Sequence, residues 1–438
     1  MGYLFNNFRF FGMNFDEERQ KESMRYIFLY IFSFLGILRS TATDTLKLDY
    51  ATAEKMLLER NLSLIAFQYN LNINDAIISQ AKLWENPILS IEQGIYDDIT
   101  DKWFDVTKTG QQVIEIQQLI VLAGKRNKNI KLQKDLKKLT EYEFAEIASA
   151  LRFELIDSYY TLDYIFKKIK ILEEQINPLQ ELSKAFYEQF KKGNVAFREA
   201  SRLSSLVLSL KSEKNQLSND FFETQKTIKK LIGDTSSTII QTSEYPILEL
   251  PSSISINDLQ NQALENRPIL KSLDQRIQIS NSNLKLQKAL AVPDLYMGLQ
   301  YDRAGSYIMD YRALTLSMPL PVFDRNQNFI KIAQYELEIA KSEKKYAEQQ
   351  VRQEVKSAFE KLTINDQLLK DYQEKFDEDF RKLLEAMLYN YQKKNITLTE
   401  FVDFYESYKD NVLEFLEVQL KRTKSIEELN YYVGKKVF

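Results

Sequence analysis

The sequence predicts a mainly α-helical protein with a small β part, built as a tandem repeat. Only 11 Gly and 8 Pro occur in 438 residues, and hydrophobic residues make up 44% of the chain. Residues 322–433 contain neither Gly nor Pro. Because these two residues are the least favourable inside a helix, a run of this length without them favours very long helices. The hydrophobic content is sufficient for a large folded protein.

Composition also excludes several classes of function. The 59 basic and 62 acidic residues nearly balance, so no basic surface points to nucleic acid. The chain has no His and no Cys, which removes the commonest general base, every thiol nucleophile and the usual soft metal ligands. We therefore expect no enzymatic activity, no cofactor, no metal site and no nucleic-acid partner.

Residues 1–42 read as an N-terminal extension followed by a signal peptide. Residues 24–38 contain one basic residue and a long apolar run, and small residues follow. This pattern is typical of a secretory signal, with cleavage after Ala42 and a mature chain from Thr43. A membrane anchor is the alternative, but the apolar run is shorter than the ~20 residues that a spanning helix needs.

The rest of the chain consists of two similar halves. An offset of 201 residues aligns Leu119 with Leu320 and Gly233 with Gly434. Chance rarely keeps a constant offset over so long a stretch, so we predict two repeats. A segment rich in Ser and Thr separates them and is typical of a linker. The predicted parts are a first repeat at 43–233, a linker at 234–255 and a second repeat at 256–438.

Each half is predicted to run helix, two strands, helix, turn, helix. In the first half, 126–192 would span roughly 100 Å as one helix, with a local kink at Pro178. The Lys-rich segment 125–138 at its start is expected to be a solvated face. A helix of roughly 100 Å is much longer than a single globular domain needs. The second half shows a heptad pattern typical of coiled coils, with apolar residues at Leu398, Phe401, Tyr405, Tyr408, Val412 and Phe415.

Four segments alternate between apolar and polar residues and are predicted to be strands. Leu295, Met297 and Leu299 form one face, and Gln300 belongs to the other. A soluble half-buried hairpin would alternate in the same way, but each segment has about the 9–11 residues that a membrane strand needs. Four strands cannot close a barrel, and an open sheet edge is too costly in lipid. Three copies would supply twelve strands, an even number within the range of known outer-membrane barrels. The strands are 88–96, 112–121, 294–303 and 311–320, and the aromatic residues Trp103, Phe104, Tyr307 and Tyr311 lie near their loops.

A strand-to-helix junction is predicted directly after the last strand. Two prolines end the strand, and an Asp and a Gln follow with the spacing of a helix-starting capping box. The chain is expected to pass here from the barrel to the long helices. The junction residues are Pro319, Pro321, Asp324, Arg325 and Asn326, followed by Gln327.

The segment Leu320-Pro-Val-Phe-Asp-Arg-Asn-Gln327 and the doubled plan of helices and hairpins resemble the TolC-like outer-membrane efflux channels. Within that family, the CzcC-like heavy-metal efflux branch is the most similar, with Asn328 in place of a Gly. The resemblance implies a homotrimer with a twelve-stranded β-barrel in outer-membrane lipid and an α-helical coiled-coil barrel across the periplasm. It also implies a passive exit duct for an inner-membrane pump of the resistance-nodulation-division type, joined through a periplasmic adaptor (membrane fusion) protein.

The resemblance further implies roles for the helix-to-helix turns at 190–195 and 391–396. In the family, these turns dock the adaptor through a Gly-centred signature, and acidic residues beyond them line the closed periplasmic mouth. The family's bracing Arg falls on Ile396, so that latch is absent or relocated. For each carboxylate, a solvated helix face is the alternative. The implied docking residues are Gly193, Asn194, Val195, Tyr391, Lys394, Asn395 and Ile396, and the implied gate residues are Glu199, Glu400 and Asp403.

The exported substrate is left open by the sequence. Heavy-metal efflux rests on the branch resemblance alone, so efflux of drugs or other organic compounds is the alternative. A soluble periplasmic coiled-coil scaffold is a further alternative, because it would need neither membrane-length strands nor trimeric closure.

Overall fold

The computed structural model describes residues 45–98, 100–243, 250, 255–304, 308–375, 378–393 and 395–438. The described residues divide into a small unit, which consists of Thr45, Leu46 and Ser236–Gln241, and a large unit, which lies within Lys47–Thr235 and Thr242–Phe438. Strands β1 (Thr45–Leu48) and β6 (Ile239–Thr242) form a two-stranded sheet, and β6 lies inside the predicted linker. The predicted signal peptide lies outside the described residues.

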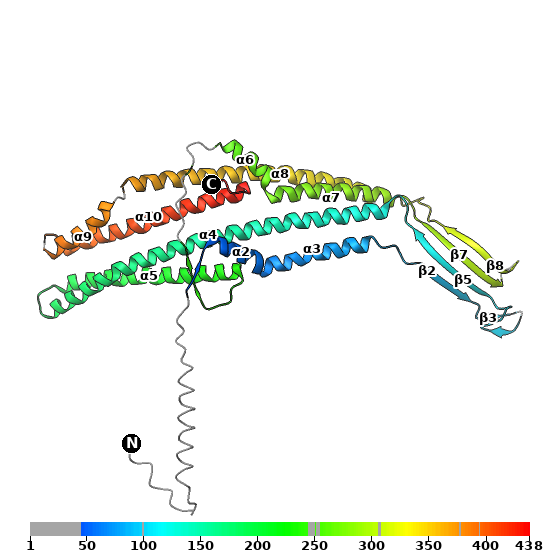
Figure 1. Cartoon of the computed structure of the whole chain (residues 1–438), viewed down its shortest axis with the longest axis horizontal. Helices are drawn as coiled ribbons and strands as arrows, with labels where there is room; N and C mark the ends of the chain where they lie inside the picture. The colour runs from blue at the N-terminus through cyan, green and yellow to red at the C-terminus, as the bar shows by residue number, and fades with distance from the viewer. Residues whose placement is uncertain are drawn as a thin grey trace, which may run out of the picture. The chain divides into compact units, whose positions relative to one another are not determined.

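The large unit consists mainly of long helices that lie side by side (Figure 1). The predicted long helix is confirmed as α4, which has 67 residues and contains Pro178. Helix α4 packs against helices of both halves. Over the described ranges, none of the helices combines the length and apolarity needed to cross a membrane. The helices are α2 (Tyr50–Arg60), α3 (Leu62–Ala81), α4 (Lys125–Lys191), α5 (Phe197–Ile232), α6 (Ile256–Asn266), α7 (Pro268–Leu290), α8 (Gln327–Lys375), α9 (Glu378–Gln392) and α10 (Leu398–Val433).

A four-stranded antiparallel sheet lies at one end of these helices (Figure 1). Its order is β2–β5–β7–β8, so one hairpin from each half contributes, and β2 and β8 form the edges of the described sheet. All four predicted strands are present, although the last ends at Ser317, before Pro319. The strands are β2 (Ile88–Gln93), β5 (Gln112–Ile120), β7 (Leu295–Ala304) and β8 (Met309–Ser317), with the short pair β3 (Tyr96–Asp97) and β4 (Lys102–Trp103) between β2 and β5.

The register of the sheet separates an apolar face from a polar one. Residues directly opposite each other on neighbouring strands share a face, and successive residues alternate. Leu299 and Gln300 therefore lie on opposite faces, as predicted. One row of the apolar face is Leu89, Ile116, Leu299 and Leu314, all exposed, and the next row, on the polar face, is Ser90, Glu115, Gln300 and Ala313.

The polar face carries a hydrogen-bonded cluster above Gly298. The Glu115 carboxylate accepts from Gln117 Nε2 at 2.7 Å and from Thr315 Oγ1 at 2.6 Å. A Cβ on Gly298 would lie 2.5 Å from Thr315 Oγ1 and 2.8 Å from Gln117 Cγ. Glycine is therefore required here for space, and the cluster links β5 to β8 across β7.

The two halves repeat in their helix ends. Helices α5 and α10 begin and end at positions 201 residues apart, and each is followed by a left-handed glycine, Gly233 with φ +67° and Gly434 with φ +78°. A Cβ on Gly233 would lie 2.7 Å from Arg60 O, and one on Gly434 would lie 3.1 Å from Arg267 N. Each glycine thus packs against the break between the two short helices of its own half.

Two apolar cores hold the helices together. The first joins α4, α5 and α10, and the second joins α6, α7, α8 and α10. Phe401 and Tyr405 belong to the first core and Tyr408 is also buried, so the packing role predicted for the heptad aromatics is confirmed. The largest side chains of the first core, besides those two, are Leu172, Ile176, Leu179, Leu203, Leu206, Leu210 and Leu398.

Candidate functional site

Both predicted turns lie at the end of the helices that is opposite the sheet (Figure 1). The first turn closes by a helix C-terminal motif, in which Asn194 N donates to Gln189 O at 2.9 Å and Gly193 N donates to Phe190 O at 2.9 Å. Asn194 Nδ2 also donates to Gln189 Oε1 at 2.7 Å. Gly193 has φ +75°, and a Cβ added to it would meet nothing within 4 Å, so only the backbone conformation requires Gly there.

The second turn repeats the two hydrogen bonds that Asn194 makes in the first. Asn395 N donates to Asn390 O at 2.9 Å, and Asn395 Nδ2 donates to Asn390 Oδ1 at 3.0 Å. Asn390 and Asn395 stand 201 residues after Gln189 and Asn194. Lys394 lies outside the described residues. The two turns thus share their closing hydrogen bonds although only the first contains Gly.

The turns differ in the exposure of their apolar side chains. Phe197, directly after the first turn, is 64% exposed, whereas Leu398 at the equivalent position is 7% exposed. The Phe190 ring contacts Phe197 with centroids 5.4 Å apart. Tyr391, in contrast, stacks on the buried Phe401 with centroids 4.9 Å apart. The first turn therefore presents an aromatic surface, which the second turn buries. Among the remaining predicted docking residues, Val195 is half-buried and Ile396 packs against the first core.

Glu400 belongs to the N-terminus of α10. Thr397 Oγ1 accepts from Glu400 N at 3.2 Å, and the Glu400 carboxylate accepts from Thr397 N at 2.8 Å and from Thr397 Oγ1 at 2.9 Å. This is a complete capping box. The hydrogen bonds from the Thr397 backbone and side chain hold the pKa of Glu400 below its ordinary value. The carboxylate is thus ionised and fixed in orientation at neutral pH.

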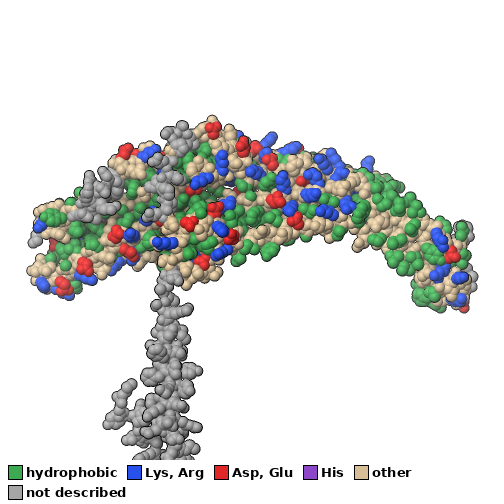
Figure 2. All heavy atoms as spheres, in the orientation of Figure 1, with side chains coloured by type: hydrophobic (Ala, Val, Ile, Leu, Met, Phe, Trp, Pro, Cys, Tyr) green, Lys and Arg blue, Asp and Glu red, His purple; other side chains and the backbone are tan. Residues whose placement is uncertain are grey.

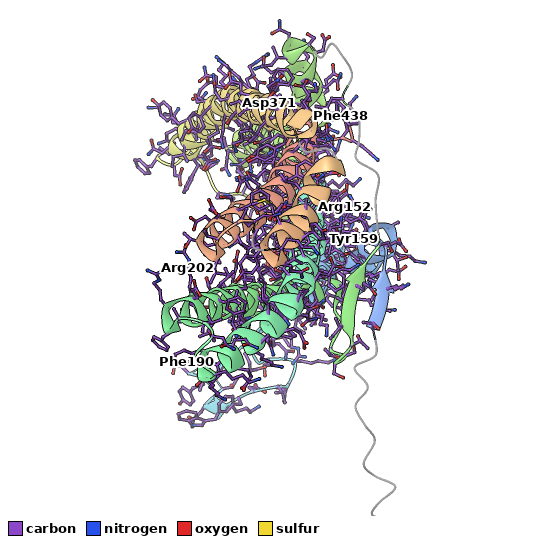
Figure 3. The ribbon with its side chains drawn as sticks, turned by 90° about the vertical axis from the view of Figure 1, so that its left-hand side faces the viewer. Arg152, Tyr159, Phe190, Arg202, Asp371 and Phe438 are labelled. Carbon is purple, nitrogen blue, oxygen red and sulfur yellow. The ribbon has the colours of Figure 1, made fainter. Side chains whose placement is uncertain are left out.

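Asp403 is paired with a cation of the other hairpin. Its Oδ1 lies 2.6 Å from Arg202 Nη2, which joins α10 to α5. Figure 3 looks onto the two turns and shows Arg202 at the border between α5 and the second hairpin. Both side chains are partly exposed, 41% for Arg202 and 61% for Asp403. The Arg latch was predicted to be absent from position 396 or relocated, and an Arg contact is present here from a different position, 202.

Glu199 lies in the first turn of α5, beside the second hairpin. Burial first, and the Glu199 carboxylate second, raise the pKa of Tyr391 to about 12. Glu199 and Glu400 are equivalent residues of the two halves, each at the third position of its helix. Carboxylates near a helix N-terminus are favoured by the helix dipole. The three predicted gate residues thus lie at one end of the two neighbouring helices α5 and α10.

Sequence reasoning missed Arg202 as part of this site. Arg202 and Asp403 are 201 residues apart, so they occupy the same position in the two halves. A pair of opposite charges at equivalent repeat positions was the available signal. It could be used only with the knowledge that α5 and α10 face each other there, and this contact brings together residues of different repeats.

The strand-to-helix junction differs from its prediction in detail. Helix α8 begins at Gln327, and the Asp324 carboxylate accepts from Asn326 N at 2.8 Å instead of capping the Gln327 N–H. Gln327 Oε1 accepts from Arg325 N at 2.8 Å. Asn326 has φ +58°, and its Nδ2 donates to Gln287 O at 2.7 Å. The start of α8 is therefore displaced by the bond to α7, which fixes Asn326. Pro319 and Pro321 lie between β8 and this turn.

Residues 259–435 match the sequence profile of a family described as outer membrane efflux protein. The predicted family resemblance is confirmed. Among curated proteins, the cobalt-zinc-cadmium resistance protein CzcC of Cupriavidus metallidurans is 21% identical over 267 residues, and the alignment covers 61% of this chain and 61% of CzcC. The aligned part of the chain thus spans about three fifths of the length of this relative.

Solved structures of outer-membrane channels share the fold. CusC superimposes with a TM-score of 0.72 at 15% identity, over 91% of this chain and 96% of CusC. The CmeC outer membrane channel of Campylobacter jejuni gives a TM-score of 0.70 at 14% identity, over 88% of this chain and 85% of CmeC. At such low identity, the likeness establishes the fold: long helices with one small sheet.

Proposed function

We propose that this chain is the outer-membrane channel of a tripartite efflux system, a passive exit duct and not an enzyme. Three copies would close into a twelve-stranded β-barrel in the outer membrane and a coiled-coil tunnel in the periplasm. Residues 1–42 would direct export, and the mature chain would consist of repeats at 43–233 and 256–438 joined by the linker at 234–255. The observation that carries the proposal is a sheet with one exposed apolar face, one polar face and two edge strands.

The sheet supports assembly of several copies. The exposed row of Leu89, Ile116, Leu299 and Leu314 suits contact with lipid, and the opposite row suits a water-filled lumen. Unpaired edge groups are too costly in lipid. Because the strands alternate in direction along β2–β5–β7–β8, β8 of one copy can pair with β2 of the next in the same antiparallel sense, and a ring of copies removes every edge.

The helices next to the two edges support the same arrangement. Helix α3 leads into β2, and α8 follows β8. If β8 of one copy pairs with β2 of the next, α8 of the first copy faces α3 of the second. Both helices carry exposed apolar side chains at helical spacing, which such a contact would bury. They are Leu62, Tyr69, Ile73 and Ile77 on α3, and Phe329, Ile332, Tyr335, Ile339 and Tyr346 on α8.

The gate is proposed to lie at the two turns. Three-fold symmetry would bring Glu400 and Asp403 of three copies around one axis, with Glu199 nearby. The Arg202–Asp403 ion pair would hold the two hairpins of each copy together in the closed state. Carboxylates in such a ring attract cations and focus the electric field of the mouth. The polar face of the sheet adds further carboxylates, Glu92, Glu115 and Asp302, without a Lys or Arg on the same face of the described strands.

The turns are also proposed to dock the periplasmic adaptor that joins the channel to an inner-membrane pump. The exposed Phe197, whose ring contacts the half-buried Phe190, favours the first turn as the stronger contact, because exposed apolar side chains mark interaction surfaces. Gly193, Asn194 and Val195 belong to this turn. Tyr391, Lys394, Asn395 and Ile396 belong to the second.

Heavy-metal cations are the proposed substrates. The similarity to CzcC, a cobalt-zinc-cadmium resistance protein, supports this choice, and the acidic polar face favours cations over anions. Efflux of organic compounds is the alternative.

A strain that lacks this chain tests the proposed function. We expect the strain to lose growth in cobalt, zinc or cadmium salts and to regain it on complementation, with drug tolerance unchanged. Loss of drug tolerance alone would reverse the choice of substrate. The purified protein should also form discrete channels in planar bilayers, and a protein that is extracted from membranes by alkaline carbonate and forms no channels would be a soluble scaffold instead.

A further inference from the structure

A cavity of about 570 Å³ lies where the long helices meet the sheet. Its wall is formed by the end of α3 and the connection to β2, the end of β5, the start of α4, the end of α7, and Asp294 just before β7. The lining combines apolar side chains, among them Leu83, Trp84 and Leu290, with the cations Lys125 and Arg126. The candidate gate lies at the opposite end of the helices (Figure 1), so this cavity is a separate feature.

The two cations of the cavity differ in how completely their charge and hydrogen-bond donors are paired. Lys125 is buried, and its Nζ lies 2.8 Å from Asp294 Oδ1, so its charge is balanced. The Arg126 guanidinium lies 4.5 Å above the Trp84 ring, and its Nη2 donates to Lys82 O at 2.6 Å. Arg126 Nε is buried and has no hydrogen-bond partner among the described residues. A buried donor without an acceptor is costly, so Arg126 offers a place for an anionic oxygen.

A carboxylate completes the polar part of the lining. Glu85 lines the cavity and is exposed, and its backbone oxygen accepts from Gln118 Nε2 at 3.0 Å, which anchors this part of the connection to β5. The cavity therefore presents one guanidinium and one carboxylate beside a balanced Lys125–Asp294 pair. The four charged groups sum to zero, which fits a ligand that carries both a positive and a negative group.

Exposed apolar residues also lie on the segments that join the sheet to the helices. Figure 2 shows hydrophobic side chains gathered over the sheet and over its junction with the helices. Phe323 is 91% exposed, more than any other large hydrophobic residue among those described. An apolar belt next to cations and an aromatic ring is typical of the interface between a membrane and water. The belt consists of Leu83, Trp84, Leu290, Val292, Met318, Leu320, Val322 and Phe323.

We propose that this cavity binds the headgroup of an aminophospholipid, with the phosphate on Arg126 and the ammonium on Glu85. The inference rests on the proposed function, which places the junction at the periplasmic surface of the outer membrane. A guanidinium recognises phosphate through charge-assisted hydrogen bonds, and a carboxylate recognises an ammonium in the same way. The glycerol and upper acyl chains would lie against Trp84, Leu83 and Leu290. The bound lipid would fix the depth at which the sheet leaves the bilayer.

The two tryptophans of the chain allow a direct test. The sequence contains only 2 Trp, at 84 and 103, so Trp103→Phe leaves Trp84 as the one indole in the full-length protein. This variant is reconstituted into phosphocholine vesicles that contain increasing amounts of a lipid with brominated acyl chains, which quench nearby indoles. The brominated lipid carries an ethanolamine, a choline or a glycerol headgroup. We expect half-maximal quenching of Trp84 at a roughly tenfold lower fraction of the ethanolamine lipid than of the other two.

Variants of the two charged groups assign the contacts. Arg126→Gln should remove the headgroup preference, and Glu85→Gln should lower the preference for ethanolamine over choline by about threefold, since an exposed ion pair is weak. Trp84→Phe leaves Trp103, far from the cavity, whose quenching should not depend on the headgroup. If the Arg126→Gln protein does not assemble, the comparison of headgroups on the Trp103→Phe protein is sufficient to test the proposed site.

The outcomes separate this inference from the proposed function. Equal quenching of Trp84 by the three headgroups, or a preference for glycerol, overturns the aminophospholipid site while protein that floats with the vesicles still supports a membrane channel. Protein that does not float with the vesicles contradicts the proposed function, and the lipid site with it.

Discussion

Arg202 and Asp403 occupy equivalent positions in the two halves of the chain, and their side chains form an ion pair of 2.6 Å between α5 and α10. A repeat that carried the same residue in both halves could not make this contact. The pair therefore depends on divergence between the halves, with a cation in the first and a carboxylate in the second. Among the described residues, it is the ion pair between the two hairpins that lies nearest to the two turns, and this makes it the natural candidate for a latch.

Removal of the latch should open the mouth without unfolding the protein. Exposed ion pairs contribute only about 0.2–1 kcal/mol to stability, so Arg202→Gln and Asp403→Asn should leave the melting temperature nearly unchanged. Each should raise the single-channel conductance of the purified channel in a planar bilayer. The exchange Arg202→Asp with Asp403→Arg should restore the low conductance. A matched control is Lys226→Gln, which breaks an exposed pair with Glu223 within α5 and should change nothing.

The two roles of Glu400 can be separated. Glu400→Gln removes the charge but keeps a side chain that can complete a capping box, so stability should hold while cation selectivity falls. Thr397→Ala keeps the charge but loses the cap, at a cost of about 1 kcal/mol, and selectivity should hold. Because the pKa of Glu400 is lowered, selectivity should persist as the pH falls to the ordinary range of a Glu carboxyl. Reversal potentials and thermal melts measure the two effects. Unchanged selectivity in Glu400→Gln would remove this residue from the pore.

The two faces of β7 should respond differently to a positive charge. Leu299→Arg places a cation on the exposed apolar face and should cost about 2–4 kcal/mol if that site lies at mid-bilayer, whereas Gln300→Arg on the polar face should be tolerated. The yield of assembled protein in outer membranes measures the difference. Equal yields of the two variants would mean that the apolar face is not in contact with lipid.

A half-buried carboxyl in α10 predicts a pH-dependent stability. Burial raises the pKa of Glu427, against hydrogen bonds from Asn430 and Tyr160 and the charge of Lys436, which lower it. An acid whose pKa is raised by folding contributes stability below its unfolded pKa, and this contribution is lost as the pH rises through the folded value. Glu427→Gln should therefore raise the melting temperature at neutral pH, by roughly 2 °C, and the gain should vanish at acidic pH. A gain that is the same at every pH would contradict this account.

The long elements were predictable because their signals are local. The predicted helix 126–192 matches α4 to within one residue at each end, and the alternation of Leu295 to Gln300 gave the correct faces of β7. The start of α8 was not predictable, because Asn326 is fixed by a bond to Gln287 on another helix. The same holds for Lys125, which was expected in a solvated face but is buried against Asp294.

The candidate site was predictable in position but not in its contacts. The family resemblance indicated both turns and the three carboxylates near them. It could not indicate that the Glu400 carboxylate would accept hydrogen bonds from Thr397 in the cap of its own helix. Nor could it indicate that Asp403 would form an ion pair with Arg202. Those contacts depend on side-chain geometry and on how the two hairpins pack against each other. The pattern of apolar residues along one helix predicts neither.

Ring closure through the edges of the sheet is the central claim, and a disulfide between copies tests it most directly. The chain contains no Cys, so Leu89→Cys on β2 can be combined in turn with Arg312→Cys, Leu314→Cys or Leu316→Cys on β8 without background. Within one copy, two strands separate β2 from β8, about 14 Å in all, which is too far for a disulfide. Oxidation of intact outer membranes should give covalent dimers and trimers for one of the three pairs, with nothing larger than a trimer. Monomers for all three pairs, or a ladder that extends beyond three chains, would contradict the account.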